Sequence, residues 1–395
     1  MNVTQVDNFN NKCIGCGACV DICPVNSLSL VENEYGFLYP NLNAGLCVDC
    51  GKCVSTCPIK KEKIKPEEQH LFAAYATDKM KHNRGSSGGV FGVLAEYFID
   101  EGYSVCGAAF DGNLQLKHRL IHTKEDLKAL TKSKYIQSNT VSIFGQIAHE
   151  LKDDKKVFFV GTPCQCESLL NYIPKKYRDN LFIADFICHG VPSQYMFNEY
   201  IKSIEREKNC KVTEFHFRTK NNGAKEPHCF TYKTVDGKNR VKTVKGDYLH
   251  STYYNAFKHY CICRESCYEC PYATIERASD ITLADFWGIE KYEKKLNITD
   301  SVSMIITNTP KGNHFFKEVS SQLYIKEYPV QYGIDSNFCL TNYTIKPDNY
   351  DAIFKCFKEN GYSVTAQKFF RASKKEILYS KLPNFITKLY VKLIK

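Results

Sequence analysis

The residues from 12 to 58 constrain the fold most, because they carry the same cysteine pattern twice. Each copy reads C-x2-C-x2-C-x3-C followed by proline, and the second copy begins 34 residues after the first. This spacing is typical of proteins that hold two 4Fe-4S clusters. A loop of this length places only three sulfurs on one cluster, so the fourth ligand of each cluster is expected from the other copy.

The crossed arrangement usual for this spacing assigns the cysteines to two clusters. The sets are Cys13, Cys16, Cys19 and Cys57 for the first cluster, and Cys47, Cys50, Cys53 and Cys23 for the second. Zinc ribbons also use paired C-x2-C motifs, but they have neither the third cysteine nor the Cys-Pro ending. We therefore predict iron–sulfur clusters, held by a ferredoxin-type module over residues 1–65 with repeats at about 4–34 and 38–65.

Composition indicates the cellular compartment and the partners of the chain. The chain has 20 cysteines in 395 residues, but its first residues show no basic start and no apolar core of a signal peptide. We found no stretch of 18 apolar residues either, so we expect a cytoplasmic protein with reduced thiols. The net charge is +10, yet basic and acidic residues are interleaved, and we expect no nucleic-acid partner.

A basic segment ends the chain. Within residues 351–395, which we treat as a tail, positions 374–395 carry six lysines and one glutamate among regularly spaced apolar residues. This pattern predicts a basic amphipathic helix interrupted by Pro383, which suits contact with an anionic membrane surface or a partner protein. The alternative is a terminal helix packed on its own domain, with its lysines in solvent.

The body of the chain has an α/β pattern. Between 71 and 195, apolar strand-like runs near 71–77, 103–110, 157–160 and 181–187 alternate with helical patterns near 90–99, 141–152, 164 onward and 194–208. After about residue 211, strands at 212–218, 281–287 and 302–307 and a hairpin at 229–244 indicate a second, α+β subdomain spanning 196–350. The predicted fold class is α/β with an added α+β part.

A turn rich in glycine and serine runs from Arg84 to Gly89, directly before a predicted helix. Free N–H groups and the helix dipole favour an anion at such a position, and a pyrophosphate would suit it. The turn is neither a G-x-G-x-x-G motif nor a Walker A loop. An ordinary helix N-cap explains the same residues.

Further cysteines gather in the body of the chain. Four of them, Cys164, Cys188, Cys267 and Cys270, are the best candidates for a third 4Fe-4S cluster. A structural zinc ion, a redox dithiol and buried cysteines that act as small apolar residues are the competing interpretations. Asp285 and the only tryptophan, Trp287, follow a predicted strand and either wall a pocket or belong to the core. The G-x-S-x-G motif of many hydrolases is absent, so the sequence gives no indication of a hydrolase.

Taken together, these segments resemble one family. The matching pieces are Ser86–Gly89, Ser133–Ser138, Gly161–Gln165, Cys188–Ser193, Cys267–Cys270 and Asp280–Gly288. The chain is similar to the coenzyme F420 (deazaflavin) hydrogenase/dehydrogenase beta-subunit family, in the version with an N-terminal two-cluster ferredoxin domain. The resemblance covers residues 1 to about 310.

The resemblance implies bound FAD and electron transfer between a two-electron substrate and iron–sulfur clusters. It places along the FAD the residues Ser86, Ser87, Gly88, Gly89, Lys134 and Tyr135, with the later cysteines around an adjacent cluster. We regard Lys134, His189 and Arg84 as candidates for stabilising reduced flavin or donating protons. Ala284 and the pair Gly223–Ala224 depart from the family's usual residues near the substrate side, so the substrate is either deazaflavin or another small molecule.

These expectations together predict an iron–sulfur flavoprotein oxidoreductase that works with a redox partner protein or a deazaflavin-type molecule. The alternative is an electron-transfer adaptor without flavin. Because similar chains occur beside genes for surface glycan assembly, this adaptor would act in surface polysaccharide biosynthesis. A glycan-modifying transferase lacks support, since no transferase motif is present.

Overall fold

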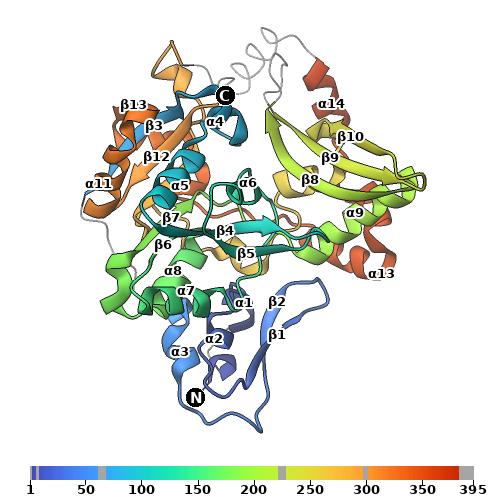
Figure 1. Cartoon of the computed structure of the whole chain (residues 1–395). Coiled ribbons are helices and arrows are strands. Elements are labelled where there is room, and N and C mark those ends of the chain that lie inside the picture. The colour runs from blue at the N-terminus through green and yellow to red at the C-terminus, as the bar shows by residue number, and fades with distance from the viewer. Residues whose placement is uncertain (1, 6–8, 61–67, 221–227, 297–300, 382–395) are drawn as a thin grey trace.

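Three β-sheets organise the part of the chain that the computed structural model describes, which comprises residues 2–5, 9–60, 68–220, 228–296 and 301–381. The first sheet belongs to a small N-terminal module, which lies at the bottom of Figure 1. An eight-stranded sheet forms the body above this module, and a three-stranded sheet stands beside the body. The predicted α/β class with an N-terminal iron–sulfur module is confirmed.

The N-terminal module repeats its backbone as well as its sequence. The antiparallel pair β1 (Leu28–Glu32) and β2 (Leu38–Leu42) is flanked by the short helices α2 (Ala18–Asp21) and α3 (Lys52–Thr56). Gly17 precedes α2 with φ 73° and ψ −3°, and Gly51 precedes α3 with φ 73° and ψ −2°. Because glycine adopts this left-handed conformation without a steric penalty, each copy turns sharply between its second and third cysteine.

The large sheet has the order β13-β3-β12-β11-β7-β6-β4-β5. Its strands are β3 (His70–Ala76), β4 (Tyr103–Phe110), β5 (Leu116–Ile121), β6 (Lys156–Gly161), β7 (Leu181–Phe186), β11 (Ile281–Asp285), β12 (Ser303–Thr307) and β13 (Leu323–Tyr328). The four central strands β4, β6, β7 and β11 run parallel, and the strands outside them pair antiparallel. Parallel strands end at one common edge, which matters for the site described below.

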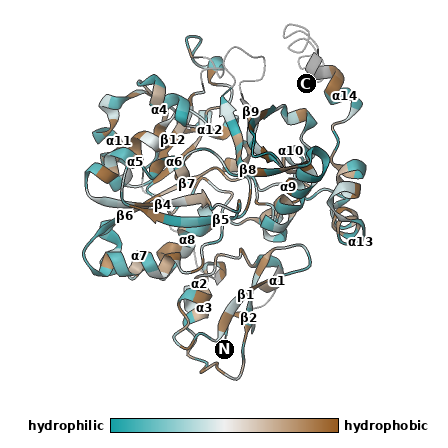
Figure 2. Cartoon of the chain, turned by 45° about the vertical axis from the view of Figure 1, so that its right-hand side comes forward, coloured by the Kyte–Doolittle hydropathy of each residue, from teal (hydrophilic) through white to brown (hydrophobic). Residues whose placement is uncertain are grey.

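Helices cover both faces of this sheet. The described α-helices are α1 (Phe9–Lys12), α2, α3, α4 (Lys79–Arg84), α5 (Val90–Asp100), α6 (Leu127–Leu130), α7 (Ile143–Lys152), α8 (Pro163–Tyr172), α9 (Gln194–Lys208), α10 (Thr252–Lys258), α11 (Pro310–Glu318), α12 (Val330–Ser336), α13 (Tyr350–Phe369) and α14 (Lys374–Lys381). Successive residues of a strand point to opposite faces. In β6, Phe158 packs with α5, while Phe159 packs with α7 on the other face. Figure 2 shows hydrophobic residues along these central strands.

The three-stranded sheet is antiparallel and consists of β8 (Cys210–Lys220), β9 (His228–Asp236) and β10 (Val241–Gly246). It shares a hydrophobic core with α9 and α13. The strands β11, β12 and β13 come later in the sequence but join the large sheet. The range 196–350, expected to form one α+β subdomain, therefore contributes strands to both sheets, because strand pairing over long sequence separations leaves no local signal.

The C-terminal segment is partly described. In α13, Ile353, Phe354 and Phe357 are buried against the body, but this helix ends before the lysine-rich segment that begins at residue 374. The following helix α14 ends at the limit of the described residues, and positions 382–395, with Pro383, lie outside them. Contact of the tail with a membrane or a partner therefore stays a prediction. Among the helices that are described, none has the length and apolar character needed to cross a membrane.

Candidate functional site

A cavity of about 1570 Å³ lies where the parallel strands end. Its wall includes Ser86, Ser87 and Gly89 from the glycine- and serine-rich turn, as well as Lys134 and Tyr135. The same wall includes all four cysteines predicted for a third cluster, Cys164, Cys188, Cys267 and Cys270. Pockets for drug-sized ligands usually measure about 300–1,000 Å³, so this cavity has room for a larger cofactor.

The turn before α5 presents backbone groups to the cavity. Gly89, at φ 81°, precedes the helix, and no side chain caps the first N–H groups of α5. The Ser86 hydroxyl instead accepts a hydrogen bond from the Ser133 amide at 2.7 Å, and the Ser87 hydroxyl lies 3.1 Å from the Ser303 hydroxyl. The N-cap alternative therefore does not describe these serines. An uncapped helix start beside a cavity suits an anion such as a phosphate group.

Gly88 holds this turn tightly against the sheet. Its carbonyl accepts a hydrogen bond from the Ala76 amide at 2.7 Å, and its own amide donates to the Ser303 hydroxyl at 2.9 Å. A Cβ atom added at Gly88 would lie only 2.5 Å from the Ala74 carbonyl oxygen. Any side chain here would therefore displace the turn from β3.

Lys134 and Tyr135 also form part of the cavity wall. The Lys134 ammonium donates to the carbonyls of Leu130, Thr131 and Lys132 at 3.0, 2.8 and 3.3 Å. Burial, aided by nearby Lys132, lowers the pKa of Lys134 to about 7. The three carbonyl contacts engage all three protons of the ammonium, so Lys134 fixes the segment that follows α6. The Tyr135 ring stacks on Phe257 with a centroid separation of 4.5 Å.

His189 and Arg84 occupy different parts of the cavity wall. His189 follows Cys188 and is largely buried, and burial lowers the pKa of its imidazole, although the Asp285 carboxylate opposes this shift. Arg84 lies at the rim with 60% of its side chain exposed, and its guanidinium is 3.5 Å from the Glu96 carboxylate. The structure therefore places His189 inside the cavity and Arg84 at its entrance.

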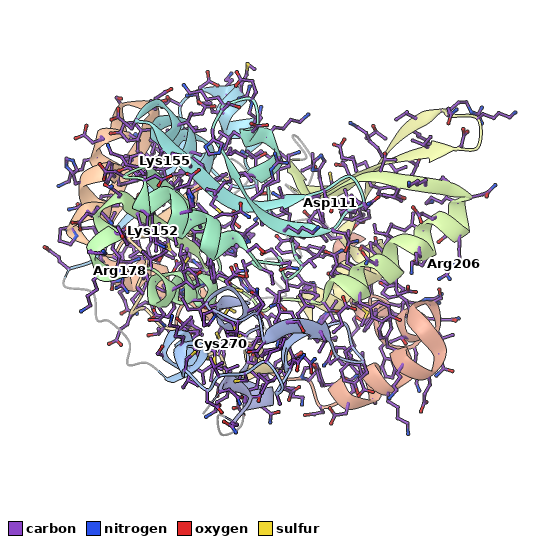
Figure 3. The ribbon with its side chains drawn as sticks, turned by 60° about the horizontal axis from the view of Figure 1, so that its bottom comes forward. Asp111, Lys152, Lys155, Arg178, Arg206 and Cys270 are labelled. Atoms are coloured by element: carbon purple, nitrogen blue, oxygen red, sulfur yellow. The ribbon has the colours of Figure 1, made fainter. Side chains whose placement is uncertain are left out.

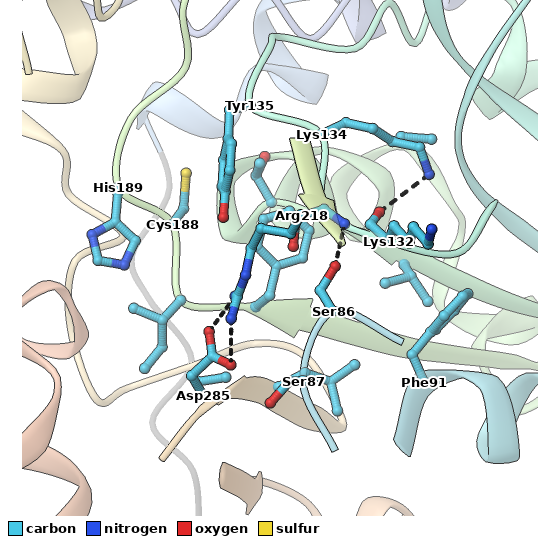
Figure 4. Close-up of a pocket in the computed structure, with 18 of the residues that line it drawn as sticks. Ser86, Ser87, Phe91, Lys132, Lys134, Tyr135, Cys188, His189, Arg218 and Asp285 are labelled. Atoms are coloured by element: carbon cyan, nitrogen blue, oxygen red, sulfur yellow. Dashed lines mark hydrogen bonds and ion pairs between the residues drawn. The ribbon is translucent and has the colours of Figure 1, made fainter. Parts of the chain in front are cut away.

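A buried ion pair, which the sequence did not reveal, links the two sheets. Arg218 from β8 contacts Asp285 at the end of β11 through two hydrogen bonds of 2.5 and 3.2 Å (Figure 4). Burial disfavours the charged guanidinium, but the adjacent carboxylate outweighs burial and raises the pKa of Arg218. The Arg218 guanidinium also lies 6.0 Å from the centre of the Trp287 ring. Asp285 and Trp287 thus belong to the wall of a cavity, the first of the two alternatives.

The four cysteines of the body face one another from three segments. Cys164 lies in the first turn of α8, Cys188 follows β7, and Cys267 and Cys270 lie in the loop after α10. Burial raises the pKa of the Cys188 thiol, and the thiols of Cys267, Cys164 and Cys270 raise it further. The four thiols therefore lie near one another on the wall of one cavity. Cys166 differs, since its thiol points to the Gly161 and Ala184 carbonyls inside the core.

The eight amino-terminal cysteines also form two groups. Burial raises the pKa of the Cys19 thiol most. Four neighbouring thiols raise it further, in decreasing order Cys16, Cys13, Cys57 and Cys53. The other four, Cys23, Cys47, Cys50 and Cys53, line a small pocket of their own. The two groups have the same members as the two crossed ligand sets expected from the sequence, except that Cys53 also acts on Cys19, and their role as ligands stays a prediction. Among the described residues, no three His, Cys, Asp or Glu side chains are grouped closely enough to hold a metal ion.

Two family models match the chain. Residues 12–61 match the 4Fe-4S dicluster domain, and residues 154–331 match the carboxyl-terminal part of the beta subunit of coenzyme F420 hydrogenase/dehydrogenase. This second match covers less than half of the chain, so it shows the family of residues 154–331 alone. The match confirms the resemblance drawn from the motifs, and it supports an iron–sulfur oxidoreductase that transfers electrons.

Other comparisons add less. The chain is similar to a chain of the F420-reducing NiFe hydrogenase complex from Methanosarcina barkeri, with 17% identity, 77% of this chain and 91% of that chain covered, and a TM-score of 0.43. A TM-score of this size is too low to establish a shared fold. No curated protein matches the chain significantly in sequence.

The N-terminal module is fastened to the body beside the cavity. The Thr140 hydroxyl donates to the Cys16 carbonyl at 2.6 Å, and the Ser142 amide donates to the Asp21 carboxylate at 2.7 Å. Cys16 and Cys164 are close enough that their thiols interact electrostatically. Figure 3 views the molecule from the side of the module and labels Cys270. The inner amino-terminal cysteines and the cysteines of the body are therefore neighbours.

The Arg218–Asp285 pair gives a prediction about stability. Replacing Arg218 by Met should lower the free energy of unfolding by about 3–5 kcal/mol, because it leaves a buried carboxylate without its partner. The double variant Arg218→Met/Asp285→Leu should lose less, because no uncompensated charge remains. Urea titration without air measures both. The exposed Arg240–Asp236 pair is the control, and Arg240→Met should change stability by at most about 1 kcal/mol. A double variant as unstable as the single one contradicts this account.

Proposed function

We propose that this protein is an iron–sulfur flavoprotein oxidoreductase that binds FAD in the cavity and three 4Fe-4S clusters. One observation carries the proposal: a single cavity is lined both by an anion-binding turn and by four converging thiols. When bound, flavin supplies the exchange between two-electron and one-electron chemistry. The residues of this chain bind the cofactors, orient them and shield them from water.

The turn at Ser86–Gly89 and the start of α5 would hold the FAD pyrophosphate. Support comes from the uncapped N–H groups of this helix and from the position of Gly88, which leaves no room for a side chain. Lysine and arginine side chains on the cavity wall also favour an anionic cofactor, since Lys81, Lys128, Lys132 and Lys258 line the cavity with Arg84. Tyr135 offers an aromatic surface at the same wall.

Cys164, Cys188, Cys267 and Cys270 would hold the third cluster. Their thiols interact with one another, yet they are not grouped as ligands of one ion, and the same holds for the amino-terminal cysteines of the dicluster domain. The two cysteine groups therefore share the same kind of arrangement. Gly190 supports the loop, because a Cβ atom there would lie 2.7 Å from the Cys263 sulfur.

Three further residues receive roles in this proposal. His189, inside the cavity and with a lowered pKa, is the candidate to give or accept a proton beside the substrate. Lys134 acts as a positioning residue, because its ammonium is already bound to three carbonyls. Arg84 at the rim would attract an anionic substrate or hold the outer end of the cofactor.

The positions of the thiol groups indicate where each redox partner would meet the protein. Cys50 of the outer set is exposed, whereas the inner set lies against the body, next to Cys164. A redox partner protein would meet the outer cluster, and a small two-electron substrate, deazaflavin or another molecule, would enter the cavity. The adaptor alternative without flavin, including a role in surface polysaccharide assembly, leaves the cavity without a purpose.

Flavin binding can be tested at the turn. In protein purified without air, we expect about one FAD per chain, and Gly88→Ala should raise the dissociation constant for FAD at least about tenfold, a loss of about 1.4 kcal/mol. The physical reason is the contact with the Ala74 carbonyl, which forces the turn to move. Gly145→Ala is the matched control, because this glycine lies in α7 and its added Cβ atom meets only the Tyr172 hydroxyl at 3.7 Å. Absence of flavin after reconstitution with FAD would favour the adaptor.

Iron content tests the third cluster separately. The intact protein should contain about 12 iron atoms, four for each of three clusters, and Cys267→Ser should reduce the content to about 8. Cys261→Ser is the control, since its thiol points to the His259 carbonyl and away from the proposed set. If Cys267→Ser retains the iron content of the unaltered protein, the third cluster does not exist.

A further inference from the structure

Arg264 is a buried cation at the junction between the N-terminal module and the body. Its side chain is 1% exposed, although it belongs to the loop between α10 and the cysteines of the body. The guanidinium donates to the Cys13 carbonyl at 2.7 Å, to the Leu38 carbonyl at 2.9 Å and to the Gln137 side-chain oxygen at 3.3 Å. One side chain thus ties the first cysteine loop, strand β2 and the cavity wall together.

Within the described part of the chain, the Arg264 guanidinium hydrogen-bonds to no carboxylate. All three acceptors are neutral groups, two carbonyls and one amide. The guanidinium also lies 4.2 Å from the centre of the Tyr39 ring and 5.6 Å from that of Phe37. A buried charge that lacks a counter-charge is costly, so a protein rarely keeps one without an anion nearby.

The position of Arg264 indicates where that anion lies. A Cβ atom added at Gly15, between Cys13 and Cys16, would lie 2.8 Å from a terminal nitrogen of Arg264. On the other side, the Arg264 carbonyl accepts a hydrogen bond from the Cys267 amide at 2.9 Å. The guanidinium therefore lies against the cysteine loop of the inner cluster. The backbone of Arg264 contacts Cys267, one of the cysteines of the body. Four thiolates around an iron–sulfur core would supply the missing negative charge.

We propose that Arg264 positions the inner amino-terminal cluster against the body and raises the reduction potential of this cluster. Reduction adds one electron to the cluster and leaves the protonation of Arg264 unchanged. A fixed positive charge nearby stabilises the reduced form, and it does so more strongly inside a protein than in water. Arg264 thereby makes the inner cluster an easier electron acceptor. The inference rests on the proposed ligand set of Cys13, Cys16, Cys19 and Cys57 but does not depend on flavin.

The test is a redox titration, without air, of the full-length protein with its clusters. Electron paramagnetic resonance measures the reduced inner cluster at each potential. At a fixed solution potential, Arg264→Gln should lower the ratio of reduced to oxidised inner cluster about tenfold, which for one electron corresponds to about 59 mV. Arg264→Lys retains the charge and should change the ratio less than threefold. The exposed residue Arg240, on β-hairpin β9–β10, provides the control Arg240→Gln, which should leave the ratio unchanged.

A second variant keeps the proposal testable if Arg264→Gln does not fold. Gln137→Glu places a carboxylate against the guanidinium without removing it, and it should lower the ratio in the same direction. Unchanged ratios in the variants that retain their iron would overturn the proposal. Because the signal comes from the cluster itself, a missing flavin would refute the proposed function but leave this result interpretable.

Discussion

The site depends on a geometric constraint: parallel strands end at the same edge of a sheet. The chain therefore emerges from β6, β7 and β11 into one region, and Cys164, Cys188 and Asp285 meet there although they are far apart in sequence. Ligands of open α/β sheets typically bind beyond the carboxyl ends of the strands. The turn at Ser86–Gly89 closes the same region from the side of β3.

Buried positive charge is the second theme of this region. Arg218 has a carboxylate partner, whereas the hydrogen-bond acceptors of Lys134 and Arg264 are neutral. Burying a cation among neutral acceptors costs free energy when no cofactor is bound. The same cation stabilises a protein that holds an anionic cofactor nearby. In the proposed function, the same charges would help to retain phosphate groups and thiolate-bound clusters and would favour the arrival of electrons. Binding and redox function would then depend on the same side chains.

Local patterns in the sequence predicted much of this arrangement. The spacing of the cysteines predicts two crossed sets, and helix α9 has the bounds that its apolar period indicated. The four cysteines of the body could be grouped because each follows a predicted strand or belongs to a short C-x2-C motif. The structure places all four on the wall of one cavity.

Long-range relations were not predictable in this way. The contact between Arg218 and Asp285 joins strands of different sheets, and neither residue lies in a motif that points to the other. The strands β11, β12 and β13 join the large sheet by pairing with β3 and β7, which no local pattern encodes. For Lys134, the sequence indicated a residue of the cofactor site, but only the structure revealed the three carbonyls that occupy its ammonium.

The most direct test of a cavity that couples two-electron to one-electron chemistry is to count the electrons that the protein accepts. Reductive titration without air, followed by visible absorbance, should show uptake of about five electrons per chain, two for a flavin and one for each of three clusters. The absorbance of oxidised flavin and that of the clusters should both bleach. Uptake of about two electrons, with bleaching of cluster absorbance alone, would contradict the account.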